Sequence, residues 1–270
     1  MITFPNAKIN LGLNVVSKRA DGFHNIETVF YPINLVDILE VVKSNTFNFC
    51  QTGIPVGGNP DDNLCVKAYR ILETEYNLKP VSIHLNKIIP MGAGLGGGSS
   101  DASFMLKAIN ILFELNLSNN KLKHYAAQIG SDCSFFIDNT PSKAHGRGEL
   151  LESINVDAIK GPHILLVKPN VHVSTKDAYA NIKPKTPTKS IQDILKTPVE
   201  EWKSGLKNDF ETTIFAKYPE ISNIKNTMYE MGAIYSSMSG SGASVFGLFN
   251  DKPNALIFNN MWHFCDIIKF

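Results

Sequence analysis

The stretch from Pro90 to Ala102, PMGAGLGGGSSDA, limits the possible folds more than any other part of the sequence. It is rich in glycine and continues directly into an apolar, helix-forming segment, FMLKAINILFEL. Glycine lets the backbone turn sharply and lets a bulky anion approach the backbone N–H groups. The start of a helix adds unpaired N–H donors and the positive end of the helix dipole. The stretch therefore predicts a phosphate-binding loop between an apolar strand, VSIHL, and a helix.

Two common phosphate-binding patterns fit this loop only in part. The P-loop pattern GxxxxGK[ST] aligns with Gly92 to Ser99, but Gly98 stands where the lysine should be. The dinucleotide pattern GxGxxG aligns with Gly92, Gly94 and Gly97, but a Rossmann fold also needs an acidic residue about 20 positions further on, at the end of a second strand. That region continues here as predicted helix. A flexible linker is a further alternative, which the flanking strand and helix disfavour.

A third pattern fits over the full span, because PMGAGLGGGSSDA resembles the loop of the GHMP kinases, which include galactokinase, homoserine kinase and mevalonate kinase. The N-terminal segment PNAKINLGLNVVSKRADGFHNIETVF is similar to PAKxNLxLxVxxxRxDGxHxxxT, the opening of the members that act on a cytidine diphosphate derivative of methylerythritol. The matching positions are Ala7, Lys8, Asn10, Leu11, Arg19, Asp21, Gly22, His24 and Thr28. GSDCSFF (130–136), GRGE (146–149), LKNDFE (206–211) and MSGSGAS (238–244) extend the resemblance over nearly the whole chain.

The order of the predicted elements indicates an α+β fold in two parts. Strands and helices alternate, and a boundary is expected near residues 150 to 160, beyond which helices dominate. The resemblance implies the two-domain GHMP kinase fold, with a ribosomal-protein-S5-like nucleotide domain over residues 1–155 and a ferredoxin-like C-terminal domain over residues 156–270.

Local patterns predict the individual elements. Strands are expected in residues 1–16 and in ETVFYPINLVDILEVV, and loops or a hairpin in residues 45–60. Asp61 or Asp62 should cap a helix over DDNLCVKAYRILETEYNL, and Ser99 or Ser100 should cap the helix after the glycine loop, which should end near Asn116. SDCSFFI is expected to form a turn and a strand. The C-terminus is expected to form a helix, NALIFNNMW, and a strand, HFCDIIKF.

Composition argues against several classes of protein. A net charge of +1 gives no global field that would favour nucleic acid or an anionic membrane. No apolar run approaches the roughly 20 residues of a membrane span, and no signal peptide is visible, so we expect a cytoplasmic protein. Cys50, Cys65, Cys133 and Cys265 lie far apart without CxxC spacing, which indicates reduced thiols and not a disulfide framework or zinc site.

Phosphoryl transfer needs alignment, charge compensation and a group that accepts the proton of the attacking hydroxyl. The resemblance assigns this acceptor to Asp132 and places Lys8 beside it. An ammonium group near Asp132 would favour its ionised form and could stabilise the attacking oxygen. The alternative is that Asp132 only forms a turn and that Lys8 is solvated on a strand face.

The resemblance also implies ATP, as its Mg²⁺ complex, as the cofactor. It maps the ATP-binding residues to Asn63, Lys87, Pro90, Met91, Gly92, Ala93, Gly94, Leu95, Gly96, Gly97, Gly98, Ser99 and Ser100. The two serines could contact the phosphates or Mg²⁺, or simply cap the helix, and Lys87 could equally be a solvated charge at a strand end. We expect Asp101 to interact with the helix dipole and to point away from the loop. We assign no metal ligand.

The substrate-binding residues implied by the resemblance are Asn10, Phe23, His24, Thr175, Tyr179, Gly240 and Ser241. Phe23 replaces the commoner tyrosine, so its ring can stack on cytosine but has no hydroxyl. Tyr179 stands where phenylalanine is often found. The second glycine loop, Ser239 to Gly242, should pack against the nucleotide loop and touch the substrate, although a simple hairpin turn is an alternative.

These resemblances imply an ATP-dependent kinase that phosphorylates the 2-hydroxyl of the cytidine diphosphate derivative of methylerythritol, giving ADP and the 2-phosphate in non-mevalonate isoprenoid biosynthesis. Its partner would be this small molecule, with no nucleic acid and no membrane, and the chain would be a monomer or homodimer. Another GHMP small-metabolite kinase and a non-catalytic GHMP-fold regulator remain alternatives. A Rossmann oxidoreductase is more distant.

Overall fold

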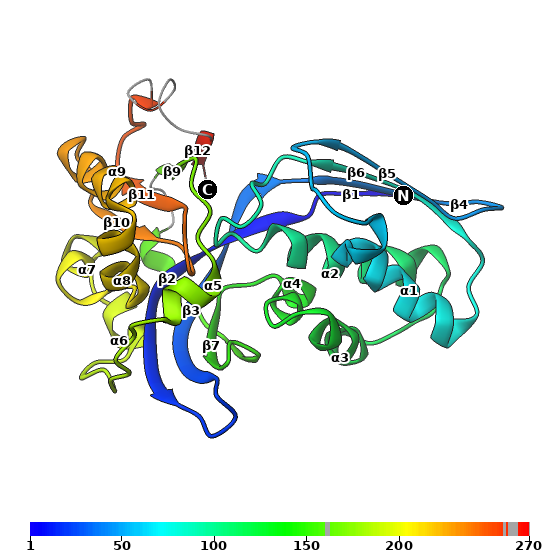
Figure 1. Cartoon of the computed structure of the whole chain (residues 1–270), viewed down its shortest axis with the longest axis horizontal. Coiled ribbons are helices and arrows are strands. Elements are labelled where there is room, and N and C mark those ends of the chain that lie inside the picture. The colour runs from blue at the N-terminus through cyan, green and yellow to red at the C-terminus, as the bar shows by residue number, and fades with distance from the viewer. Residues whose placement is uncertain (160–162, 256–257, 259–263, 270) are drawn as a thin grey trace. The chain divides into compact units, whose positions relative to one another are not determined.

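The computed structural model describes residues 1–159, 163–255, 258 and 264–269 (Figure 1). The chain forms two compact units. Unit 1 comprises residues 1–7, 35–91 and 96–140, and unit 2 comprises residues 8–34, 92–95 and 141–270. Each unit therefore combines segments that are distant in sequence, and the glycine loop contributes residues to both.

Unit 1 contains a four-stranded sheet with two helices packed on it (Figure 1). In sheet order, the strands are β1 (Ile2–Thr3), β4 (Ile38–Lys43), β6 (Val81–Lys87) and β5 (Asn48–Gly53), and only β5 pairs in parallel. The helices are α1 (Leu64–Tyr76) and α2 (Gly97–Leu112). Buried and partly buried residues alternate along β6, because one face of the sheet lies against the helices. A 3₁₀ turn, η1 (Pro60–Asp62), and two further helices, α3 (Asn119–Ile129) and α4 (Cys133–Asp138), complete the unit.

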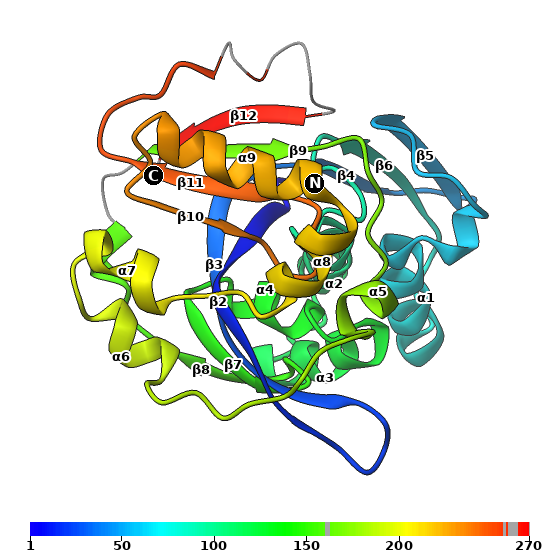
Figure 2. The ribbon, with the colours of Figure 1, turned by 60° about the vertical axis from the view of Figure 1, so that its left-hand side comes forward.

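Unit 2 contains two four-stranded sheets (Figure 2). The first has the order β2 (Asn6–Lys18), β3 (His24–Val36), β7 (Ser142–Gly146) and β8 (Leu150–Ser153), and the first two residues of β2 belong to unit 1. The second is antiparallel, in the order β10 (Tyr235–Met238), β11 (Val245–Phe249), β9 (His163–Lys168) and β12 (Phe264–Lys269).

Helices cover the second sheet of unit 2 and bury its apolar side chains. The helices of this unit are η2 (Asp157–Ile159), α5 (Thr175–Tyr179), α6 (Ile191–Leu195), α7 (Val199–Gly205), α8 (Phe210–Lys217) and α9 (Pro219–Glu230). Helix α9 contacts β10 and β11, and its buried residues Ile221, Ile224 and Met228 share a core with Val167 and Val245 (Figure 2). The spacing of three and four residues between these side chains places them on one face of the helix.

Most predicted elements are confirmed, but several details are wrong. Residues 48–53 form strand β5, because their pairing with β6 overrides a loop-like composition. SDCSFFI contains helix α4 and no strand, since a short apolar run does not distinguish the two. Asn63 caps α1, because Asp61 and Asp62 lie in the preceding 3₁₀ turn.

A further error concerns α2, which ends at Leu112 and not near Asn116. Glu114 and Asn116 both have positive φ, which an α-helix cannot contain. The predicted helix NALIFNNMW lies largely outside the described residues, whereas the final strand is confirmed as β12.

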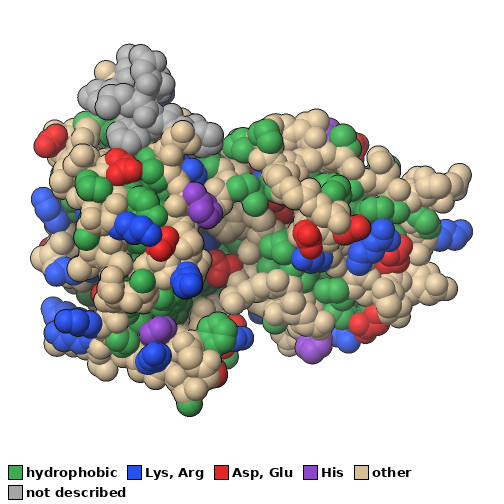
Figure 3. All heavy atoms as spheres, viewed as in Figure 1, with side chains coloured by type: hydrophobic (Ala, Val, Ile, Leu, Met, Phe, Trp, Pro, Cys, Tyr) green, Lys and Arg blue, Asp and Glu red, His purple; other side chains and the backbone are tan. Residues whose placement is uncertain are grey.

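On the face shown in Figure 3, Lys and Arg side chains are interspersed with Asp and Glu side chains, in line with the net charge of +1. None of the helices in the described residues is both long and apolar enough to cross a membrane.

Candidate active site

A pocket of about 430 Å³ opens in unit 1. Four of the predicted nucleotide-binding residues lie in its wall, namely Asn63, Lys87, Met91 and Gly98. The other lining residues are Phe49, Gln51, Pro55, Val56, Gly57, Gly58, Asn59, Pro60, Asp62, Leu64 and Asp101. The segment 55–60, expected only to connect two elements, thus forms much of one wall. The glycine and proline residues of this segment were the one sequence feature that could have pointed to its place in the pocket wall.

Lys87 is fully buried between two carboxylates. Its ammonium donates hydrogen bonds to Asp37, at short range, and to Asp101 at 2.8 Å. All three side chains are at most 3% exposed. The solvated alternative for Lys87 is therefore wrong, and so is the expectation that Asp101 points away. We call Asp37, Lys87 and Asp101 the charge cluster.

Asp37 was not among the residues predicted from the sequence, although an acidic residue inside the apolar run INLVDILEVV was a usable signal. Its Oδ2 accepts from the Lys87 ammonium, and its Oδ1 accepts from the backbone N–H groups of Ile88 at 2.6 Å and Ile89 at 2.9 Å. Residues 88 and 89 lie between strand β6 and the glycine loop, so Asp37 fixes the path of the chain that leads to the loop.

The charge cluster contains two acids and one base, and this imbalance affects their protonation. Burial, opposed by the Lys87 ammonium, raises the pKa of Asp101 to about 7. Burial disfavours the charge on Lys87, but the two carboxylates outweigh that penalty and raise its pKa. Asp101 Oδ1 is buried without a hydrogen-bond partner in the described part of the chain. Asp101 is therefore protonated more readily than an ordinary aspartate, whereas Lys87 keeps its charge more firmly than an ordinary lysine.

The glycine loop follows a path that only glycine adopts easily. Gly92, Gly94 and Gly96 have φ values of 57°, 74° and 73°. A Cβ atom on Gly94 would lie 2.0 Å from the carbonyl oxygen of Ser239. The Ser239 hydroxyl donates to the Gly94 carbonyl at 2.9 Å. The expected packing of the second glycine loop against the first is confirmed.

Gly96 is the N-cap of α2 and provides no side-chain hydrogen bond to cap this helix. The prediction that Ser99 or Ser100 is the N-cap is therefore wrong. Since glycine offers no side-chain acceptor, the first-turn N–H groups remain available to an anion, as phosphate binding requires. Ser100 is buried and its hydroxyl has no hydrogen-bond partner in the described chain, whereas Ser99 is half-buried.

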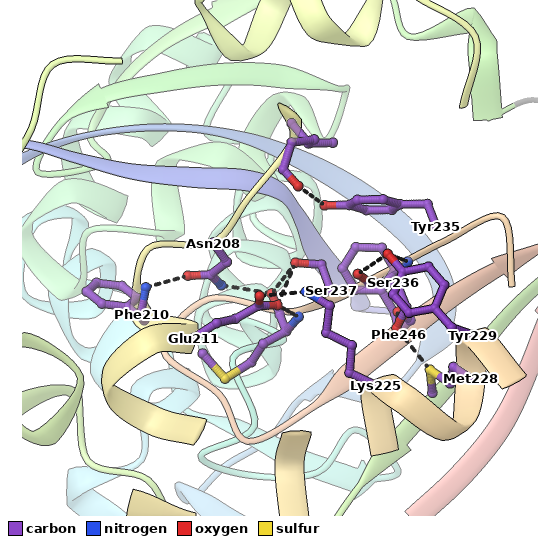
Figure 4. A network of polar contacts seen from close by, with 12 residues as sticks. Asn208, Phe210, Glu211, Lys225, Met228, Tyr229, Tyr235, Ser236, Ser237 and Phe246 are labelled. Atoms are coloured by element: carbon purple, nitrogen blue, oxygen red, sulfur yellow. Dashed lines mark hydrogen bonds and ion pairs between the residues drawn. The ribbon is translucent and has the colours of Figure 1, made fainter. Parts of the chain in front are cut away.

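The motif LKNDFE holds the second glycine loop (Figure 4). Asn208 donates from its amide to the carbonyl groups of Met238 and Gly240, each at 2.8 Å. Glu211 accepts from the Met238 backbone N–H at 2.8 Å and from the Lys225 ammonium at 2.6 Å (Figure 4). The LKNDFE motif, for which the sequence predicted no role, thus positions Gly240, one of the predicted substrate-binding residues.

Lys8 is 3% exposed, so its solvated alternative is wrong. It donates to Asn10 Oδ1 at 2.7 Å, and its ammonium lies 4.8 Å from the centre of the Phe30 ring. Asn10 in turn donates to the hydroxyl of Thr28 at 2.9 Å. These side chains form a buried polar row along β2 and β3 in unit 2.

Asp132, in unit 1, directly precedes α4, is half-buried and makes no capping hydrogen bond.

Two of the predicted substrate-binding aromatics are in contact. The rings of His24 and Tyr179 stack with centroids 4.9 Å apart, and Tyr179 meets Phe210 edge-on at 4.7 Å. Phe23 is 55% exposed. Thr175 is exposed at the start of α5, the helix that ends with Tyr179. The predicted stacking residues therefore lie on the β2–β3 turn and on α5.

Comparisons with known proteins agree with this geometry. Residues 63–144 match the family description "GHMP kinases N terminal domain", and residues 190–262 match "GHMP kinases C terminal". A relative from Bacteroides thetaiotaomicron, described as 4-diphosphocytidyl-2-C-methyl-D-erythritol kinase, is 55% identical over 93% of both chains. A protein of the same description from Clostridium botulinum is 39% identical over 97% of this chain and 95% of its own.

Solved structures give the same result. A crystal structure of 4-(cytidine 5'-diphospho)-2C-methyl-D-erythritol kinase superposes with a TM-score of 0.79 at 32% identity, covering 92% of this chain and 90% of that one. A mevalonate kinase with 14% identity and a TM-score of 0.70 shares the fold. The α+β GHMP fold expected from the sequence is confirmed. The chain belongs to the GHMP kinases and, within them, to the 4-diphosphocytidyl-2-C-methyl-D-erythritol kinase family.

Proposed function

We propose that the chain transfers the terminal phosphoryl group of ATP to the 2-hydroxyl of 4-diphosphocytidyl-2-C-methyl-D-erythritol, giving ADP and the 2-phosphate in the non-mevalonate route to isoprenoid precursors. The observation that carries this proposal is the 55% identity with a kinase of that description over 93% of both chains. The alternatives of another GHMP metabolite kinase or a non-catalytic regulator are not favoured by any feature of the site.

ATP would bind through the pocket of unit 1 and the glycine loop. The uncapped N-terminus of α2 offers backbone N–H groups to the phosphates. The pocket wall contributes Asn63, Lys87, Met91 and Gly98 toward the rest of the nucleotide. The remaining predicted residues, Pro90, Gly92 to Gly97, Ser99 and Ser100, form the loop and the first turn of α2. Mg²⁺ would enter as the ATP complex.

Asp132 would accept the proton of the 2-hydroxyl as its oxygen attacks the terminal phosphorus and the bond to the bridging oxygen of ADP breaks. Lys8 would stabilise the negative charge that develops on the attacking oxygen. Its burial and its hydrogen bond to Asn10 support this role, because they hold the ammonium in one position.

The substrate would bind in unit 2. Phe23 and Tyr179 offer rings for stacking on cytosine, and His24 offers a ring nitrogen to the edge of the base. Asn10, Thr175, Gly240 and Ser241 would also contact the substrate. We further propose that residues 1–155 and 156–270 are the two GHMP domains, and that the chain works as a monomer or homodimer in the cytoplasm, where ATP is available.

Replacing Asp132 by alanine tests the proposed chemistry. We expect turnover of the cytidyl substrate to fall at least a thousandfold, the upper part of the range for general-base catalysis, while ADP affinity is retained. Lys8→Met should also lower kcat. Asp138→Asn is the matched control, because Asp138 lies at the other end of α4 in an exposed ion pair with Lys123 and should leave activity unchanged.

A substrate panel tests the proposed specificity. Galactose, homoserine, mevalonate and the cytidyl substrate should be assayed with the wild-type chain under identical conditions. We expect turnover of the cytidyl substrate alone. Full activity of Asp132→Ala would refute the assignment of the base, and turnover of any other alcohol at a comparable rate would refute the substrate.

A further inference from the structure

The GRGE motif forms a rigid turn between β7 and β8, and the proposed reaction gives it no role. Gly146 and Gly148 have φ values of 70° and 108°, in the region that favours glycine. The Arg147 backbone N–H donates to Glu149 Oε2 at 2.5 Å. A Cβ atom on Gly146 would lie 2.9 Å from the same oxygen. The turn therefore has little freedom, and it fixes the direction in which the Arg147 side chain leaves the backbone.

Arg147 reaches the turn between β2 and β3 and lies over the ring of Phe23. Its Cζ atom is 5.0 Å from the ring centroid, within the range of a cation–π contact. The Phe23 ring is 55% exposed and the Arg147 side chain 43% exposed, so a ligand can reach both. Glu149 also pairs with the guanidinium, with 3.8 Å between its Oε1 and Arg147 Nε.

The backbone of Phe23 is already fixed by its own turn. Its N–H donates to Asp21 Oδ1 at 3.1 Å, and its carbonyl accepts from the Arg19 N–H at 2.8 Å. Arg19 also pairs with Asp21, with 3.0 Å between Arg19 Nη2 and Asp21 Oδ2. These hydrogen bonds do not restrict rotation of the Phe23 ring about its side-chain bonds. A phenylalanine ring offers no hydroxyl for a hydrogen bond, so a contact with its face must hold it in place.

We propose that Arg147 is a positioning residue that holds the Phe23 ring as a ready platform for the cytosine base. The inference rests on the proposed function, in which Phe23 stacks on the base. The guanidinium occupies one face of the ring and so leaves the remaining surface of the ring to the ligand. Arg147 acts through Phe23 and does not itself bind the diphosphate. Loss of its side chain therefore lowers affinity for the base and leaves the chemical step unchanged.

A double-mutant cycle with Arg147→Ala and Phe23→Leu tests the coupling. The dissociation constants of cytidine, CMP and CDP are measured by calorimetry, and kcat and KM are measured with the cytidyl substrate. We expect Arg147→Ala to weaken CDP binding two- to fivefold, the size of an exposed cation–π contact, with kcat unchanged. The factor should be the same for all three ligands and should vanish in the Phe23→Leu background. Arg147→Lys should restore part of the loss.

Arg70→Ala is the matched control, because Arg70 makes the same kind of contact with Phe47 in unit 1, with Cζ 3.9 Å from the ring centroid. It should leave the affinity for CDP unchanged. An Arg147→Ala effect that persists in the Phe23→Leu background, or that grows from cytidine to CDP, would overturn the inference and place the guanidinium on the phosphates.

The same measurements separate this inference from the proposed function. If Phe23→Leu weakens CDP binding while Arg147→Ala does not, only the positioning role of Arg147 is wrong. If the wild-type chain binds none of the three cytidine ligands, the proposed substrate is wrong and the inference fails with it.

Discussion

The charge cluster of unit 1 and the aromatic residues of unit 2 differ in their exposure to solvent. The cluster buries two carboxylates and an ammonium at no more than 3% exposure, and Lys87 and Asp101 form part of a pocket wall. The aromatic residues Phe23, His24 and Tyr179 lie at a turn and on a short helix, and Phe23 is more than half exposed. The first group is part of the folded interior, whereas in the second group Phe23 is exposed and His24 and Tyr179 are half-buried.

This difference predicts where mutations act. Removing one partner of a buried ion pair leaves an uncompensated charge, which costs far more than the pair contributes when intact. Removing an exposed ring costs little stability, because the ring gains little burial on folding. Unit 1 should therefore lose stability when its site is altered, and unit 2 should lose affinity.

Lys87→Met should have the largest effect. Methionine has a similar length but no charge, so Asp37 and Asp101 would face each other without their shared cation. We expect a loss of about 3–5 kcal/mol of unfolding free energy, and a fall in Tm of about 10 °C for a chain of this size. Differential scanning calorimetry would measure it.

Phe23→Leu is the comparison for this experiment and should change Tm by no more than about 2 °C. The double variant Lys87→Met with Asp101→Asn should recover part of the lost stability, because one of the two unpaired charges is removed. A Tm for Lys87→Met within about 2 °C of the wild type would show that the two regions do not differ as described.

Asp101→Asn should have a smaller effect that depends on pH. Burial raises the pKa of Asp101 to about 7, well above the value of about 4 in an unfolded chain. Between these values the folded state holds more protons than the unfolded state, so the contribution of Asp101 is greatest at low pH and is lost as the pH rises through 7. Asparagine cannot titrate. The unfolding free energy of the wild type, relative to the variant, should therefore fall by about 2 kcal/mol between pH 5 and pH 8.

The unfolding free energies of the wild type and of Asp101→Asn would be measured in urea at one-unit pH intervals. Subtracting one from the other removes the contributions of the titratable groups that the two proteins share. Asp138→Asn, in an exposed ion pair, should show no such trend. A difference that is constant from pH 5 to pH 8, or that changes in the opposite direction, would mean that Asp101 is ionised throughout.

The sequence predicted features that depend on local chemistry. The glycine loop, the strand before it and the helix after it follow from composition and spacing. The motif PMGAGLGGGSSDA also identified the family. The family in turn directed attention to Lys8, whose burial no local pattern indicates.

The features that the sequence did not predict depend on contacts between distant residues. Asp37 and Lys87 are 50 positions apart, and only the pairing of β4 with β6 brings their backbones together. Strand β5 exists because β6 offers it a free edge. The burial of Asp101 and Lys87 was not predicted, because charged side chains usually lie in solvent and the buried partner Asp37 was not recognised.

Substitution of Asn63 should have the smallest effect on unfolding free energy. This residue combines the two roles compared above, because it stabilises a helix and also lines the pocket. Its Oδ1 accepts from the Cys65 N–H at 2.9 Å and so caps α1, while the residue also lines the pocket. Asn63→Asp keeps the cap and loses the amide N–H groups, whereas Asn63→Ala loses both. We expect alanine to cost about 1 kcal/mol of stability, the value of an N-cap, and aspartate to cost nothing measurable. If the amide also contacts the nucleotide, both variants should raise the KM for ATP by a similar factor. If the KM for ATP rises in Asn63→Ala, which loses stability, but is unchanged in Asn63→Asp, which does not, then Asn63 acts only as a helix cap.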